Sequence, residues 1–278
     1  MEEFEFHQVD VFTSGPLLGN PLAVVAGADI LTDAQMAAFA RWTNLSETAF
    51  LTRPLLAGAD YRIRIFTPHQ ELAFAGHPTL GSCHAWLAAG GEPKGEEIVQ
   101  ECGIGLVRIR LAPGLLFFAA PPMVRSGPLD PDLLAKVIEG LRLPSDAFVA
   151  ANWVDNGPGW LAVLLRSRTD VLAVRPDYAL LSGLRVGVIG PSDTPGDDPV
   201  ADFEVRAFTA AGFEDAATGS LNAGLARWLM NVGVAASSYV VSQGTAIGRA
   251  ARLHVECERG EIWVGGAVST RITGRLAL

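Results

Sequence analysis

Alternating apolar and polar residues near the start of the chain predict a β-strand over 4–11, and a short apolar run after a turn predicts a second over 22–25. Apolar residues then recur at helical spacing between Thr32, a suitable N-cap residue, and Asn44. The same patterns predict helices over 78–89, 131–141 and 220–231 and strands over 46–51, 61–66, 148–154, 160–164, 186–189, 203–208, 238–242, 251–256 and 261–268, with two or three short strands within 97–118. A loop rich in acidic residues, proline and glycine is expected over 190–199. Many short strands with one long apolar helix in each half indicate the α+β class, with a curled β-sheet or half-barrel around each helix.

One pattern occurs twice along the chain. R-I-F-T at 64–67 precedes a helix that starts at Gly76, and R-A-F-T at 206–209 precedes a helix that starts at Gly219. The two offsets, 142 and 143 residues, agree, and L-A-V follows a turn at both 22–24 and 161–163. Self-similarity at a fixed period marks repeated units, so the sequence predicts two pseudo-symmetric domains.

A proline-rich segment over 119–128 is the predicted boundary between these domains. We expect an N-terminal domain over 1–118 and a C-terminal domain over 119–267, with a final strand over about 268–278 as a candidate to complete the first. A chain of 278 residues is long for one hydrophobic core and comfortable for two.

Composition narrows the classes of partner and compartment. The chain is 49% hydrophobic with 18% charged residues, yet its apolar runs are shorter than the roughly 18 residues of a membrane helix. The net charge of −9 without a cluster of Lys or Arg disfavours nucleic-acid binding. The acidic, alternating N-terminus differs from a secretory signal and is typical of a first strand. Three scattered cysteines without a disulfide pattern indicate the cytosol as the compartment. A small molecule is therefore the expected partner.

The three cysteines, Cys83, Cys102 and Cys257, are scattered along the chain. They have no C-x2-C spacing, so the sequence predicts neither a disulfide framework nor a metal site. Cys83 and His84 are neighbours on one helix and point to different faces, which favours a packing role for both.

Both repeated helix starts are candidate anion sites, because the first N–H groups of a helix bind negative charge. At Gly76, His77 and Pro78 the glycine permits close approach of a ligand, and the alternative is a structural turn with a surface histidine. At Thr218 and Ser220 the hydroxyls could position a ligand, and the alternative is ordinary helix capping.

Two carboxylates are candidates for chemistry near these helices. Glu47 interrupts an apolar run, and partial burial would raise its pKa toward neutrality, as a general acid/base requires. A salt-bridged Glu or a Glu on an edge strand is the alternative. Asp215 lies five residues before Ser220 among small residues that could let it face a cleft, and a solvated loop acid is its alternative.

Several further motifs lie in a fixed order along the chain. They are V-D-V-F-T at 9–13, G-N-P-L-A-V-V at 19–25, N-L-S-E-T at 44–48, R-I-R-I-F-T-P at 62–68, F-A-G-H-P-T at 74–79, E-D-A-A-T-G-S at 214–220, and Q-G at 243–244 with G-R at 248–249. This set resembles the signatures of the PhzF-like isomerases, which are related to phenazine-biosynthesis PhzF and more distantly to diaminopimelate epimerase. The resemblance implies two similar domains with the site between them, a homodimer and a biosynthetic isomerase that needs no cofactor.

Residue roles follow from the resemblance by motif. It implies that Glu47 is the proton shuttle and that His77, Asp215 and Ser220 position the substrate. The N–H groups around Gly76 and Gly219 would hold the substrate carboxylate, with Thr218 and Asn20 as further binding residues. Ala73, Ala216 and the pair Leu221-Asn222 depart from the family pattern, which bears on the substrate more than on the chemistry.

Related racemases use one cysteine at each helix start, where this chain has His77 and Ser220. Two-base epimerisation is thus disfavoured, because Glu47 is the one obvious base. The sequence predicts a cofactor-independent isomerase that transfers a proton on a small carboxylate-bearing metabolite. A non-catalytic protein that binds a small acid or a partner, or an amino-acid racemase, is the alternative.

Overall fold

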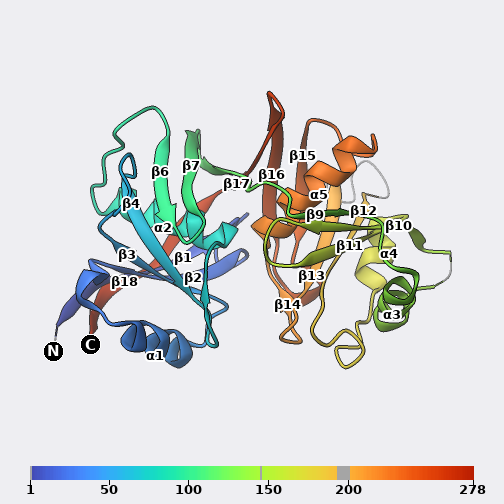
Figure 1. The fold of residues 1–278 in the computed structure, drawn as a ribbon, viewed down its shortest axis with the longest axis horizontal. Coiled ribbons are helices and arrows are strands. Elements are labelled where there is room, and N and C mark those ends of the chain that lie inside the picture. Colours follow the sequence, from blue (N-terminus) through green and yellow to red (C-terminus); the bar gives the residue numbers. More distant parts are fainter. Residues whose placement is uncertain (1, 145, 193–200) are drawn as a thin grey trace. The chain divides into compact units, whose positions relative to one another are not determined.

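The chain divides into two compact units. In the computed structural model, which describes residues 2–144, 146–192 and 201–278, the first unit comprises Met1–Ala119 with Gly265–Leu278 and the second Ala120–Val264. Each unit combines a β-sheet with a buried helix (Figure 1). The predicted α+β class is confirmed.

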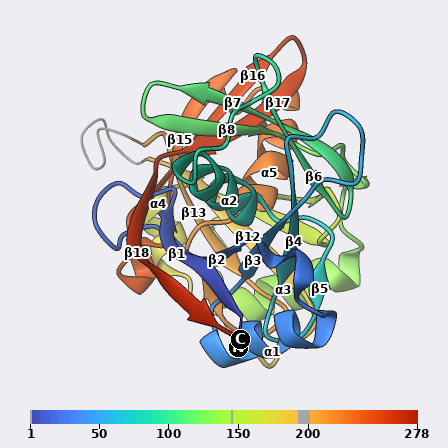
Figure 2. The same ribbon diagram turned by 90° about the vertical axis from the view of Figure 1, so that its left-hand side faces the viewer.

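The sheet of the first unit uses strands from both ends of the chain. Its elements are β1 (Glu3–Val11), β2 (Asn20–Ala26), η1 (Ala28–Ile30), α1 (Asp33–Thr43), β3 (Thr48–Thr52), β4 (Tyr61–Phe66), β5 (Glu71–Leu72), α2 (Gly76–Ala88), β6 (Ile98–Cys102), β7 (Gly105–Ala112), β8 (Leu115–Ala119) and β18 (Val268–Ala277). β1 lies between β2 and β18, antiparallel to both. Backbone hydrogen bonds of 2.9 and 3.1 Å between Glu2 and Leu278 continue the β1–β18 pair to the two termini, which Figure 2 shows together.

The second unit has a similar set of elements. They are β9 (Arg125–Gly127), α3 (Pro131–Leu141), β10 (Phe148–Asp155), β11 (Trp160–Leu165), α4 (Arg168–Ala173), β12 (Arg185–Pro191), β13 (Phe203–Phe208), β14 (Glu214–Asp215), α5 (Gly219–Asn231), β15 (Ser238–Gln243), η2 (Thr245–Ile247), β16 (Ala251–Glu258) and β17 (Glu261–Gly266). Its strands pair in the order β9, β10, β11, β12, β13, β15 and β16.

Strand direction alternates in the same way in both units. The pairs β1–β2, β3–β4 and β6–β7 are antiparallel, whereas β2–β3 and β4–β6 are parallel. In the second unit β10–β11, β12–β13 and β15–β16 are antiparallel, and β11–β12 and β13–β15 are parallel. The predicted internal duplication is therefore confirmed by the topology.

Side chains repeat as well as strands. Arg64 on β4 makes two hydrogen bonds of 2.7 Å to Glu71, and Arg206 on β13 makes bonds of 3.0 and 2.7 Å to Glu214. Each guanidinium also lies over the phenylalanine two residues later, at 5.1 and 5.0 Å from the ring centroid. A bidentate pair joins the long strand to the two-residue strand that precedes the helix.

The helices α2 and α5 are the cores of their units. Residues 76–83 of α2 and 219–226 of α5 are all buried. α2 contacts β1, β2, β3, β4, β8 and β18, and α5 contacts β10, β11 and β16. Small residues allow this close approach, since a Cβ at Gly224 would strike the Val154 carbonyl oxygen. Each helix start is thereby held rigidly by its sheet.

A second helix packs on the outside of each sheet. Thr32 caps α1 and forms a capping box with Gln35, which confirms the predicted N-cap. Met36 and Phe39 of this helix pack in one core cluster with Val25 and Phe50. In the second unit Val137 and Leu141 of α3 join a core with strand residues such as Val186.

Four expectations need correction. The helix α4 was missed, because its six residues are too short for a helical period to show. The proline-rich segment contains a strand, β9, on β10. Strand β3 begins at Thr48, so Glu47 lies just before it. Gly190 and Pro191 extend β12, while 193–199 of the expected loop lies outside the described residues.

Within residues 2–144, 146–192 and 201–278, none of the helices has the length and apolar character needed to cross a membrane.

Candidate active site

The start of α2 presents backbone N–H groups in a buried setting. Ala75 is the N-cap residue in an extended conformation, and within the described residues no side chain caps the helix. Gly76, His77 and Pro78 form the first turn and are buried. The Thr79 hydroxyl donates to the Ala75 carbonyl at 2.9 Å, so it points back into the helix. The helix start therefore lacks a side-chain cap, and it stays the candidate anion site that the sequence predicts.

Glu47 lies against this helix start. Its Oε2 is 3.4 Å from Nε2 of His77, and the two side chains are 18% and 5% exposed. Burial raises the pKa of Glu47 to about 7, while the neighbouring Ser46 hydroxyl lowers it. A carboxyl with this pKa can both accept and donate a proton near neutrality.

Asn20 begins β2 and is buried, opposite Val11 on β1. The parallel register of Ala23 with Thr48 puts Asn20 and Glu47 at the same end of the β2–β3 pair. The two residues come to one end of the sheet because parallel strands align their amino termini.

The start of α5 carries a network of polar side chains. Thr218 is the N-cap residue, yet its hydroxyl donates to Asp215 Oδ2 at 2.6 Å, and no described side chain caps this helix either. The alternative of ordinary helix capping by these hydroxyls is therefore not what the structure shows. Asp215 lies on β14, paired with Ala207 of β13, which corrects the expectation of a loop position.

Ser220 occupies the first turn of α5. Its Oγ accepts a hydrogen bond of 3.1 Å from Trp160 Nε1, and its carbonyl accepts one of 2.9 Å from Asn156. Trp160 begins β11 and is buried. The bonds fix the position of the hydroxyl oxygen and leave the Ser220 O–H to donate elsewhere.

Gln243 organises the network from the end of β15. Its Oε1 accepts from the Thr218 N–H at 3.1 Å and from Asn222 at 3.0 Å, and its Nε2 donates to the Thr218 hydroxyl at 2.9 Å and the Asp215 carbonyl at 3.1 Å. Gln243 and Asn222 are fully buried. Asn222 thus supports the helix start from inside, although it departs from the family pattern.

Sequence reasoning missed Trp160, Asn156 and the role of Gln243. A buried polar residue must find a partner, so a glutamine at the end of an apolar strand was the available signal. The partners lie 21 to 64 residues away along the chain, which a local pattern cannot supply.

Burial makes two of the three cysteines poor nucleophiles. Cys83 and Cys102 are buried, and burial raises both thiol pKa values, that of Cys83 to about 12. His84 bonds Thr270 at 2.9 Å, in agreement with a packing role. Across the described part of the chain no cluster of three His, Cys, Asp or Glu residues could hold a metal ion.

The predicted site residues thus form two groups. Glu47, His77, Gly76 and Asn20 belong to the first unit, where Glu47 and His77 are in contact. Asp215, Thr218, Gly219 and Ser220 belong to the second unit, where one network joins Asp215 to Thr218.

A family model and a solved structure relate this chain to phenazine-biosynthesis-like proteins, and a relative of similar sequence is an isomerase. The model of a family described as phenazine biosynthesis-like protein, PhzC-PhzF, matches residues 9–277. Antisense-enhancing sequence 1 of Schizosaccharomyces pombe is 34% identical and covers 99% of both chains. The trans-2,3-dihydro-3-hydroxyanthranilate isomerase of Pseudomonas fluorescens is 34% identical over 90% of this chain and 89% of its own. A PhzF-family crystal structure from Enterococcus faecalis, 23% identical, shares the fold over all of both chains with a TM-score of 0.81.

Proposed function

Because the chain belongs to the PhzC-PhzF phenazine biosynthesis-like family and is an isomerase, we propose that it moves a proton on a small carboxylate-bearing metabolite without a cofactor. Glu47 acts as the general acid/base. The observation that carries this proposal is its pKa of about 7 together with its contact with His77 at the α2 start.

The proposed reaction needs one carboxyl group. Ionised Glu47 accepts a proton from a substrate carbon, and the neutral acid returns it at a second carbon of the same conjugated system. A double bond moves, and the substrate gains or loses no atoms. The N–H groups that start α2 and α5 hold the substrate carboxylate and stabilise the charge that develops.

The comparison of the two repeats favours one base. Thr48 pairs with Phe66, and Val186 pairs with Phe208, so the preceding residues Glu47 and Arg185 are equivalent. The second repeat therefore carries a cation where the first carries the carboxyl. Racemisation with a base on each face of the carbon is correspondingly disfavoured.

Asp215, Ser220 and His77 are proposed to orient the substrate, with Thr218 and Asn20 supporting them. The Asp215 and Thr218 side chains are bonded at 2.6 Å, and Ser220 is held by Trp160. We expect Asp215→Asn and Ser220→Ala to raise the Michaelis constant, because they remove contacts with the bound substrate. This proposal requires that groups of both units act on one substrate.

The test is hydrogen exchange into substrate in D2O, read by mass spectrometry. The panel contains trans-2,3-dihydro-3-hydroxyanthranilate, the substrate in the name of a relative, and cyclic and β-hydroxy amino acids. Glu47→Gln should lower turnover by about 10² to 10⁴ and leave binding nearly unchanged. Glu96→Gln, at an exposed carboxylate, is the control.

Two outcomes separate the alternatives. Deuterium incorporation at the parent rate in Glu47→Gln would reassign the shuttle to another residue. Binding of panel members without any exchange in the parent protein would favour a small-acid binding protein.

The remaining proposals concern cofactor use, oligomeric state, compartment and domain boundaries. We expect turnover to survive chelators, the protein to form a homodimer by light scattering, and the enzyme to work in the cytosol without a nucleic-acid or membrane partner. The proposed domains are 1–118, with the last strand, and 119–267, and expression of each alone would test their independence.

A further inference from the structure

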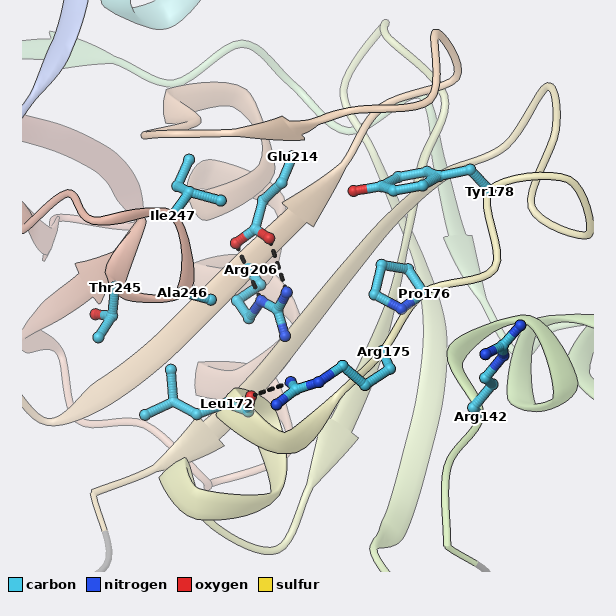
Figure 3. Close-up of a pocket in the computed structure, with 10 residues that line it drawn as sticks. All are labelled: Arg142, Leu172, Arg175, Pro176, Tyr178, Arg206, Glu214, Thr245, Ala246 and Ile247. Atoms are coloured by element: carbon cyan, nitrogen blue, oxygen red, sulfur yellow. Dashed lines mark hydrogen bonds and ion pairs between the residues drawn. The ribbon is translucent and has the colours of Figure 1, made fainter.

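The second unit has a cavity of about 620 Å³ whose lining the proposed reaction does not use. Figure 3 shows it between the segment after α4, the β13–β14 pair and η2, with three arginines in its wall. They are Arg142, Arg175 and Arg206. Three guanidinium groups around one hollow suggest an anionic ligand, provided that their charges are not already matched.

Two of the three arginines are matched by carboxylates. Arg206 donates through Nε and Nη2 to Glu214 and through Nη1 to the carbonyls of Val171 and Val174, at 3.2 and 2.8 Å. Arg142 pairs with Asp177 at 2.8 Å. The charges of these two side chains are therefore balanced.

The third arginine, Arg175, bonds only to backbone carbonyls in the described part of the chain. Its Nη1 donates to the carbonyls of Leu172 and Val174 at 3.0 and 3.1 Å, which orients the side chain along the cavity wall. Among the described residues no carboxylate pairs with it. Arg175 supplies one uncompensated positive charge and N–H groups of Nε and Nη2 for a ligand.

Tyr178 adds a neutral donor. Its ring packs edge-on against Phe208, with centroids 6.2 Å apart, and Figure 3 shows the hydroxyl directed over the cavity. Burial and the charge of Glu214 raise its pKa, so the phenol keeps its proton. The hydroxyl has no hydrogen-bond partner within the part of the chain that the structure describes.

The arginine of the first unit that is equivalent to Arg206 has an additional carboxylate partner. There Arg64 bonds Asp33 of α1 at 2.6 Å, in addition to Glu71. The helix in this place in the second unit, α4, has six residues against eleven in α1. Arg206 meets α4 only at its last turn, through the carbonyls of Val171 and Val174, and it also lines the cavity.

We propose that this cavity binds a monocarboxylate with an apolar ring, outside the active site. Arg175 would bind the carboxylate and Tyr178 would donate to it. Leu172, Pro176 and Ile247 line the same cavity and would contact the ring. One negative charge is the match, because Arg175 is the one uncompensated cation among the described residues that line the cavity.

The test measures binding of 4-fluorobenzoate to the full chain by calorimetry and ¹⁹F NMR. Saturable binding with a Kd below about 10 mM is expected, and neutral 4-fluorobenzamide should bind at least roughly tenfold more weakly. Arg175→Gln should raise Kd by about tenfold or more. Arg175 also bonds the end of α4, so a second variant leaves it in place and adds a negative charge at Ala246, an exposed residue of the cavity lining. Ala246→Asp should raise Kd by a similar factor. Ala246→Asn is the uncharged control and should bind like the parent.

Ser220→Ala separates this cavity from the proposed active site. Binding that is lost in Ala246→Asp and kept in Ser220→Ala supports the proposal. The proposal is overturned if the parent shows no saturable binding of 4-fluorobenzoate or binds the benzamide equally well. It is also overturned if the affinity is unchanged in both Arg175→Gln and Ala246→Asp, or if binding is lost only in Ser220→Ala. None of these results depends on turnover, so failure here leaves the proposed isomerase reaction standing.

Discussion

Oε2 of Glu47 lies 3.4 Å from Nε2 of His77, and both side chains are largely withdrawn from solvent in the first unit. The carboxyl comes from the residue before β3 and the imidazole from the first turn of α2. Withdrawal from water raises the pKa of Glu47 to about 7, so protonated and ionised forms are both populated at neutral pH. The contact gives the carboxyl a fixed place beside the N–H groups of the helix.

The first prediction concerns the pH dependence of exchange. If ionised Glu47 is the base, kcat/KM should rise about tenfold per pH unit below 7 and level off above it, because only the carboxylate accepts the proton. The measurement is deuterium incorporation between pH 5 and 9, on the order of one point per half unit. If the residual activity of Glu47→Gln still rose with pH at the same midpoint, the titrating group would be another residue and not Glu47.

The second prediction concerns stability. The folded-state pKa of Glu47, about 7, exceeds the ordinary 4.5, so the folded protein holds a proton that the unfolded chain has lost between these values. The contribution of this carboxyl to stability is therefore full below pH 4.5 and falls as pH rises to 7. Relative to the parent, Glu47→Gln should gain up to about 3 kcal/mol between pH 4.5 and pH 8 in urea unfolding.

The control for this experiment is Glu96→Gln, whose carboxylate is exposed in both states. Its free energy of unfolding should follow the parent across the pH range. If the difference in free energy of unfolding between Glu47→Gln and the parent stayed constant from pH 4.5 to pH 8, Glu47 would be ionised in the folded protein over this whole range.

The sequence predicted the repeat because each copy retains its most constrained residues. Arg64 and Arg206 must reach Glu71 and Glu214, and Gly81 and Gly224 must let α2 and α5 approach their sheets. These requirements are local, so they leave motifs at a fixed offset. The cap at Thr32 was predictable for the same reason.

The supporting network of the site was not predictable from local patterns. Trp160 reaches Ser220 across 60 residues, and Gln243 reaches Thr218 across 25. Such contacts follow from strand order, which depends on the whole sheet. The contact of Glu47 with His77 likewise needs β3 and α2 to meet, whereas the burial of Glu47 could be anticipated from its apolar neighbours.

The third prediction compares the repeated ion pairs. Arg206 and Glu214 are each 5% exposed, whereas Arg64 and Glu71 are 17% and 42% exposed. Glu214→Gln should cost about 3 to 5 kcal/mol of unfolding free energy, because it leaves a buried guanidinium without its counter-charge. Glu71→Gln should cost about 1 kcal/mol or less, since water and Asp33 remain near Arg64. Urea unfolding at neutral pH measures both, and equal costs would show that burial does not distinguish the pairs.

The fourth prediction compares the repeated helix glycines, Gly81 in α2 and Gly224 in α5. In a helix interior, alanine is favoured over glycine by about 1 kcal/mol. At Gly224 the new methyl would strike the carbonyl oxygen of Val154, a backbone atom held in β10, and overpacking of this kind costs about 1 to 3 kcal/mol or more. At Gly81 the nearest atoms are side-chain methyls of Leu22, Val11 and Val9, which can shift. Gly224→Ala should therefore destabilise the protein by about 2 kcal/mol, and Gly81→Ala by about 1 kcal/mol or less. Chemical denaturation of the two variants measures the difference, and a Gly224→Ala protein as stable as the parent would mean that α5 can move away from β10 without loss.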